Sequence, residues 1–338
     1  MDNLTHSLTG LLLARAGMRR AAPRGTLLLL LAANAPDVDV LAWWRGPLAY
    51  LRFHRSLTHA AAMAPVMAVL AAAAVWFLAG PARREFRWGS ACLAALAGVG
   101  SHILMDFTNT YGIRPWLPFS GKWYSWDISF IVDLWVWAAL LLAAGLPALG
   151  RLINAEIGAR PETGKAAAVA GLLFIVAWWG ARDLLHKQAV ATLSQHLYGF
   201  DPAATSQPGD RAQGPSPPLR VAAFPTAANP FAWRGLIETE SFYQVINVDV
   251  RRPLDPSAGK ILYKPSLTAP LEAALQARTA REFSAFARYQ YAAVDRMEGG
   301  GYRVTLTDLR FQGERRDAFL CTIDLDENLK VTRESFSF

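Results

Sequence analysis

Cysteine is nearly absent from this 338-residue chain, which contains only Cys92 and Cys321. The two residues lie far apart, and neither is part of a CxxC pair. This scarcity argues against a disulfide framework and against a thiolate metal site. Histidine is also rare, with six residues, yet four of the six fall within the first 102 positions.

Charge is missing from four long stretches, in which no Asp, Glu, Lys or Arg occurs: residues 56–82, 88–105, 134–150 and 166–181. Apolar residues make up 53% of the chain. Because a bilayer core of about 30 Å needs roughly 20 apolar residues per helix, these stretches predict membrane spans. We expect four spanning helices, near 57–79, 88–108, 129–149 and 166–184.

Two shorter apolar stretches, 7–14 and 26–35, come first and are too short to span a bilayer alone. They predict half-buried, re-entrant or interfacial helices. A secretory signal would place its basic residues before the apolar stretch, whereas Arg15, Arg19 and Arg20 follow it. The pattern therefore favours a retained segment over a cleaved signal.

The second half of the chain has a different composition. Five prolines between positions 201 and 218 are typical of an extended connector. Beyond it, the aromatic and β-branched residues of 232–250 predict extended segments. Residues 266–287 have helical spacing, and Gly299, Gly300 and Gly301 predict a hairpin turn. Alternating segments predict strands at the end of the chain: 289–294, 302–309, 318–325 and 330–336.

These features predict a mainly α fold, a polytopic membrane bundle with about four spanning and two short N-terminal helices. A small soluble α+β domain with an antiparallel sheet follows. The expected boundaries are a membrane-embedded metal-site domain over 1–190, a Pro-rich linker over 191–220 and the soluble domain over 221–338.

Net charge is +7, and the surplus lies in the first 197 residues, with 17 basic against 10 acidic residues. Basic residues beside membrane helices usually set topology, so no nucleic-acid partner is predicted. Ten basic residues fall in loops on one side and seven on the side of the candidate site. We expect a multi-pass protein of the inner membrane, and by the positive-inside rule its site and its C-terminal domain would face away from the cytoplasm.

Imidazole and carboxylate side chains gather at the ends of the apolar segments. An up-and-down helix arrangement would bring them to one membrane face, and His102 and Asp106, four apart, would share one helix face. Such groups are ligands for zinc or a similar divalent ion. The candidate ligands are His6, Asp37, Asp39, His54, His59, His102 and Asp106.

Simpler interpretations remain open for each candidate. His6 could be solvated or cap a helix, and Asp37 and Asp39 could form a turn after Pro36. His54 and His59 could lie beside lipid headgroups. His102 could hydrogen-bond a neighbouring helix.

Three further charged residues have candidate roles beside the metal. Arg55 could grip a phosphate or anchor a headgroup. Asp133, an acid within an apolar region, could take part in catalysis, orient a ligand imidazole or pair with Arg114. Asp127 could serve the site or only cap its helix. The aromatic residues of 111–126 are typical of an interfacial belt, and a lid over the site is the alternative.

Five motifs, taken in order, resemble the YdjM/YbcI-like family of membrane-bound metal-dependent hydrolases: MDNLTHSLTG, APDVD, HRSLTH, SHILMDFTNTYG and WYSWDISFIVD. The resemblance covers roughly residues 1–185, and ANPFAWRG at 228–235 is similar to the tail of longer members. It implies a metal site at six positions: His6, Asp37, His54, His59, His102 and Asp106. A more distant similarity to zinc-dependent phospholipase C and P1-type nucleases implies phosphoester hydrolysis with one to three zinc ions.

The leading hypothesis is thus a membrane-bound hydrolase of a phosphoester or lipid-like substrate, with a metal-activated water and with Asp39, Arg55 and Asp133 assisting. Membrane lipid and an amphiphilic substrate are the expected partners. The alternative is a non-catalytic membrane protein with a structural metal and a C-terminal binding module. A metal transporter would need ligands along a path through the bilayer, which their placement at one face disfavours.

Overall fold

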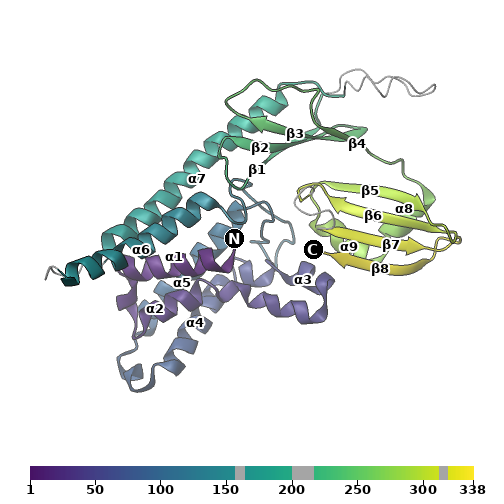
Figure 1. The fold of residues 1–338 in the computed structure, drawn as a ribbon. Coiled ribbons are helices and arrows are strands. Elements are labelled where there is room, and N and C mark those ends of the chain that lie inside the picture. Colours follow the sequence, from purple (N-terminus) through teal and green to yellow (C-terminus); the bar gives the residue numbers. More distant parts are fainter. Residues whose placement is uncertain (157–163, 200–216, 312–318) are drawn as a thin grey trace. The chain divides into compact units, whose positions relative to one another are not determined.

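The structure is a computed structural model that describes residues 1–156, 164–199, 217–311 and 319–338. Its contacts divide the chain into two compact units (Figure 1). The first unit comprises Met1–Val40, His54–Leu184 and Pro225–Pro230, and the second comprises Leu41–Phe53, Leu185–Phe224 and Phe231–Phe338. Residues 200–216, within the expected Pro-rich linker, lie outside the described residues.

The first unit is built from helices. Its elements are α1 (Asn3–Ala16), η1 (Met18–Ala21), α2 (Gly25–Ala32), the first part of η2 (Ala35–Arg45), η3 (Leu57–His59), α4 (Ala64–Leu78), η4 (Gly80–Glu85), α5 (Trp88–Thr108), α6 (Leu134–Glu156) and most of α7 (Lys165–Ser194). Asp2 caps α1 by accepting a hydrogen bond from the backbone N–H of Thr5 at 3.0 Å. Gly17 ends the helix with a φ of 137°, a conformation that favours glycine.

Small residues let α1, α2 and α5 approach closely. A Cβ added at Gly10 of α1 would lie 2.6 Å from the carbonyl oxygen of Leu29 in α2. A Cβ added at Gly98 of α5 would lie 2.8 Å from the Cβ of Ala32, also in α2. Small residues at helix contacts are typical of membrane bundles, where packing replaces the hydrophobic effect.

Two described helices are long and apolar enough to cross a membrane, α5 and α7. Two bent pairs raise the number to as many as four: α2 with η2, bent by 47°, and Pro47–His59 with α4, bent by 87°. The helix expected at 88–108 matches α5. The described part of the chain therefore contains two to four candidate spans.

The expected continuous helix over 57–79 is wrong at its start. Only the 3-10 turn η3 forms at Leu57–His59, and the α-helix begins at Ala64. Pro65 suits the first turn of a helix, where its missing N–H is not needed. The preceding backbone bonds elsewhere, since the N–H of Ala61 donates to the carbonyl of Pro115 at 2.9 Å.

The second unit contains two four-stranded sheets, where the sequence predicted one. The first sheet has the order β1 (Arg220–Pro225), β2 (Ala232–Glu238), β3 (Phe242–Asp249) and β4 (Lys260–Tyr263). The second has β5 (Gln290–Arg296), β6 (Tyr302–Asp308), β7 (Leu320–Leu325) and β8 (Val331–Ser337), all antiparallel. Helices α3 (Pro47–Phe53), α8 (Ala269–Leu275) and α9 (Arg278–Phe286) belong to the same unit.

The strands of the second sheet lie where alternation predicted them, and the three glycines connect β5 to β6. Strands β1 and β4 were missed because neither has a clear alternating pattern. Helix α7 is longer than expected, at 30 residues. Its last turns pack Ala189 and Leu193 into a core with Trp233 and Ile246 of the first sheet.

Candidate metal centre

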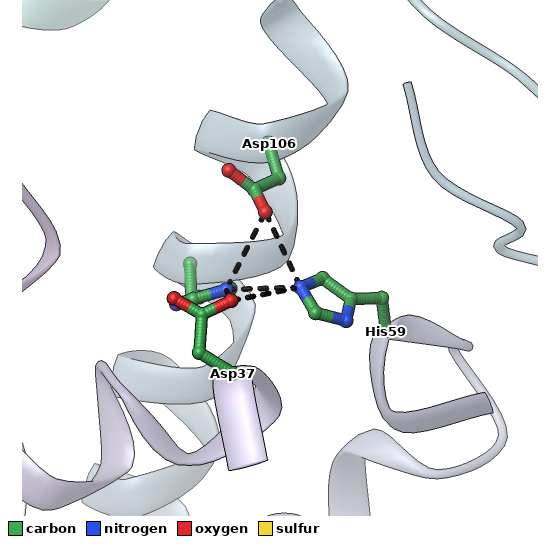
Figure 2. A group of neighbouring side chains, drawn as sticks. Asp37, His59 and Asp106 are labelled. Atoms are coloured by element: carbon green, nitrogen blue, oxygen red, sulfur yellow. Dashed lines mark hydrogen bonds and ion pairs between the residues drawn. The ribbon is translucent and has the colours of Figure 1, made fainter. Parts of the chain in front are cut away.

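Four side chains converge on a small volume in the first unit: Asp37, His59, His102 and Asp106 (Figure 2). The Nε2 atoms of His59 and His102 lie 3.1 Å apart. Asp106 Oδ2 lies 3.2 Å from the first nitrogen and 3.5 Å from the second. Asp37 Oδ1 lies 3.6 Å from His59 Nε2 and 3.4 Å from His102 Nε2. We call these four residues the quartet.

The quartet has the dimensions of a metal coordination shell. Metal–ligand bonds of about 2.0–2.1 Å, as zinc makes with imidazole and carboxylate, give a tetrahedron with edges of about 3.3–3.4 Å. The five distances above fall between 3.1 and 3.6 Å. Two nitrogens and two oxygens at this spacing fit a divalent ion such as zinc.

Three different elements position the quartet. Asp37 lies in the first turn of η2, and His59 ends η3. His102 and Asp106 lie one turn apart on α5, so one helix face presents both. Both histidines and Asp106 are fully buried, whereas the Asp37 side chain keeps 12% of its surface exposed.

Hydrogen bonds to Nδ1 direct the Nε2 lone pairs of both histidines inward. His102 Nδ1 lies 2.7 Å from the carbonyl oxygen of Ala33, which can only accept a hydrogen bond. His59 Nδ1 lies 3.3 Å from Asp39 Oδ2 and 3.1 Å from Thr58 Oγ1. Each ring therefore carries its proton on Nδ1, the tautomer that a metal-binding Nε2 requires.

Asp39 is not part of the quartet. It contacts the Nδ1 side of His59, opposite the nitrogen that faces the other quartet members. Its Oδ2 also accepts hydrogen bonds from the backbone N–H of Arg55 at 2.9 Å and from Thr58 Oγ1 at 3.0 Å. Its Oδ1 lies 2.9 Å from His54 Nδ1. Asp39 thus joins His54, Arg55 and His59 in one network, and Asp37, Asp39 and His54 form a second group of closely spaced candidate ligands.

Arg55 is buried and points into the site. Its Nε lies 2.9 Å from Asp106 Oδ2, and its NH1 donates to Asn109 Oδ1 at 2.9 Å. The guanidinium also lies over the ring of Tyr111, 5.0 Å from its centre. In the described contacts, Arg55 neutralises Asp106 and ties the end of α5 to the HRSLTH segment.

His6 lies against the quartet but does not face its centre. Its ring stacks on that of His102 at 3.7 Å, and its Nε2 lies 3.3 Å from Asp106 Oδ1, the oxygen turned away from the other histidines. The amino group of Met1 contacts the same oxygen. Nδ1 of His6, fully buried, has no hydrogen-bond partner among the described residues.

Asp133 lies at the start of α6, where its side chain bonds the first turn of the helix. Its Oδ1 accepts hydrogen bonds from the backbone N–H groups of Trp135 and Val136 at 3.0 and 3.2 Å. Asp133 is therefore the capping residue of α6, the role considered for Asp127. Asp127 itself accepts a hydrogen bond from Ser125 at 2.9 Å in a turn before the helix.

Sequence reasoning missed Thr58, Asn109 and the carbonyl of Ala33. Thr58 lies between His54 and His59, and Asn109 follows the pair His102 and Asp106 closely in the chain. These positions could have indicated that both residues lie near the site. The Ala33 carbonyl had no signal, because any residue supplies one.

The profile of the YdjM inner membrane protein family matches residues 1–189. The profile of the YfhP C-terminal alpha/beta plait domain matches residues 270–338, which hold α9, the second sheet and most of α8. Comparison with curated proteins and with solved structures found no match.

Proposed function

Because this chain belongs to the YdjM inner membrane protein family, we propose that its buried quartet is the metal centre of a membrane-bound hydrolase. The observation that carries the proposal is the convergence of two imidazole nitrogens and two carboxylate oxygens at coordination spacing. Zinc is the ion that this ligand set favours. One ion fits the quartet, and the group of Asp37, Asp39 and His54 offers ligands for a second.

A bound divalent ion would supply a Lewis acid and a water that deprotonates near neutral pH. The chain's own residues prepare the site for this chemistry. Asp39 and the Ala33 carbonyl keep the His59 and His102 rings in the metal-binding tautomer. Arg55 holds Asp106 in place and adds a fixed positive charge beside it, which suits an anionic substrate.

The substrate we propose is a phosphoester of amphiphilic character, and membrane lipid is its proposed source. Asp37 is the only quartet member with appreciable exposed surface, so it marks the accessible edge. Its chain neighbour Val38 is 47% exposed, and Leu57, two positions before His59, is also 47% exposed. Exposed apolar side chains in these segments favour a substrate with an apolar body.

We further propose that the site faces away from the cytoplasm. The support is the charge imbalance described above, since the positive-inside rule places the more basic loops in the cytoplasm. Protease treatment of sealed inverted and right-side-out vesicles tests this orientation. Cleavage of the C-terminal unit only in inverted vesicles would reverse it.

A structural metal site is the second candidate function. Four protein ligands already complete a tetrahedron, and catalytic zinc sites usually keep one position for water. On this alternative, the ion would hold η2, η3 and α5 together, and the C-terminal unit would be a binding module. The two functions differ in one requirement. A catalytic site would need water to take the place of Asp37 as a ligand, whereas a structural site would keep all four protein ligands.

The test is elemental analysis of detergent-purified protein, followed by a panel of water-soluble and lipid phosphoesters. We expect stoichiometric zinc in the wild type and its loss in His59→Ala and Asp106→Ala. His196→Ala is the matched control, because this histidine hydrogen-bonds the carbonyl of Thr192. Zinc with metal-dependent phosphate release supports the hydrolase; zinc without turnover of any substrate supports the structural site; absence of zinc contradicts both.

A further inference from the structure

A cavity of about 280 Å³ lies between α3 and α9, within the second unit. Three arginines and one glutamate line it: Arg45, Arg52, Arg278 and Glu282. The described charges therefore leave an excess of two positive charges around one small cavity. None of these residues belongs to the metal centre.

The charges in this cavity are incompletely paired. Glu282 Oε1 lies 3.3 Å from Arg52 NH1, so the one carboxylate compensates one guanidinium. Arg45 and Arg278 make no ion pair with any residue that the structure describes. Converging guanidinium groups bind phosphoryl oxygens through paired N–H donors, and arginine is better suited to this than lysine.

The remaining wall is apolar. Leu48 and Phe53 line the cavity, and Phe53 is 44% exposed. Trp43 and Trp44 precede Arg45, and Trp44 is 85% exposed. Exposed aromatic residues beside arginines are typical of segments at a membrane surface, where rings meet acyl chains and guanidiniums meet headgroups.

We propose that the cavity between α3 and α9 is a phosphoryl-binding site separate from the metal centre. The phosphoryl group comes either from an anionic phospholipid headgroup or from a phosphate monoester in solution. The segment that lines it, residues 45–53, lies in the chain between Asp39 and His54. Occupancy of the cavity would therefore restrict the motion of a segment that is followed directly by His54 and preceded, six positions before Arg45, by Asp39.

Calorimetric titration of the full chain tests the proposal. The protein is kept metal-free with a chelator, in a zwitterionic detergent, so that phosphate cannot bind through an ion. The probes are inorganic phosphate, glycerol phosphate, short-chain phosphatidic acid and short-chain phosphatidylcholine. Binding of phosphatidic acid alone identifies a lipid headgroup as the source, whereas equal binding of glycerol phosphate identifies a soluble phosphate.

Three variants test whether the phosphorylated probes bind in this cavity. Arg45→Gln with Arg278→Gln should weaken phosphoryl binding at least about tenfold, because two charge-assisted contacts are lost. Glu282→Gln should strengthen binding, since it removes the competing carboxylate and releases Arg52; loss of a purely structural contact would not do this. Arg281→Gln, on the same helix but outside the lining, is the matched control.

The proposal is overturned if none of the phosphorylated probes binds, or if the paired arginine variant binds them as the wild type does. A similar loss in Arg281→Gln would also overturn it, because the effect would then be one of general surface charge. The substituted side chains are exposed or half-buried, so the variants should retain their fold.

Discussion

His59 and His102 present their Nε2 atoms to each other at 3.1 Å, although 43 positions separate them in the chain. Both rings carry their proton on Nδ1, since Ala33 and Asp39 accept from that side. Two lone pairs therefore face each other in a buried site, beside two carboxylate oxygens. Such an arrangement is unfavourable unless a cation lies among the four atoms.

Substitution of Asp39 tests the role of its hydrogen bond with His59 Nδ1. Asp39→Asn should lower zinc affinity about 10–100-fold, because the ring loses the carboxylate that fixes its tautomer and orientation. Competition with a chromophoric chelator measures the change. Asp295→Asn, at an exposed position on β5, is the control. Unchanged affinity in Asp39→Asn would contradict the proposed support of His59.

Removal of the buried guanidinium tests the charge balance at Asp106. Arg55→Gln should destabilise the metal-free protein by about 3–5 kcal/mol, because a buried carboxylate loses its cationic partner. Zinc should restore more stability to this variant than to the wild type, since the ion supplies the missing charge. Thermal unfolding with and without chelator measures both effects. An equal gain from zinc in the two proteins would argue against coupling between Arg55 and the metal.

Helix packing at α5 offers a paired test on neighbouring glycines. Gly98→Ala should destabilise the fold by about 1–3 kcal/mol, because its Cβ would lie 2.8 Å from that of Ala32 and push α5 from α2. Zinc affinity should fall as well, since the shift separates His102 from Ala33. Gly100→Ala, with nothing within 4 Å of the added Cβ, should change neither property. Similar behaviour of the two variants would show that this contact does not position His102.

Alkaline pH should destabilise the second unit through Cys321. Burial raises the pKa of this thiol to about 12, whereas an unfolded chain ionises it near pH 8.5. The neutral thiol is favoured in the folded state, so its contribution is complete below about pH 8.5 and is lost progressively as pH rises towards 12.

The comparison is between the wild type and Cys321→Ala, unfolded by urea at pH 8 and at pH 10.5. The wild type should lose about 2 kcal/mol more than the variant over this interval. Other groups that titrate in the same range cancel in the difference. Equal losses would show that the Cys321 thiol is not held neutral by the fold.

Much of the architecture is visible in local patterns. Absence of charge over 88–105 predicts α5, because burial in lipid leaves few alternatives to an apolar helix. Alternation predicts β5 to β8, because side chains of a strand point alternately to its two faces. The break before α4 was not visible, since residues 56–63 lack Asp, Glu, Lys and Arg just as the helix does. Contacts such as that of Ala61 with Pro115 separate the two segments in the structure.

The order of amino acids is enough to single out the His and Asp motifs and the family that shares them. It also predicts that these residues gather at one membrane face, because successive helices run in opposite directions. Which role each residue of a motif has is decided by the tertiary structure. Asp37 and Asp39 are two positions apart, yet one faces Nε2 of His59 and the other Nδ1. That difference arises from where η2 turns against η3 and α5, and contacts between distant segments leave no periodic trace in the chain.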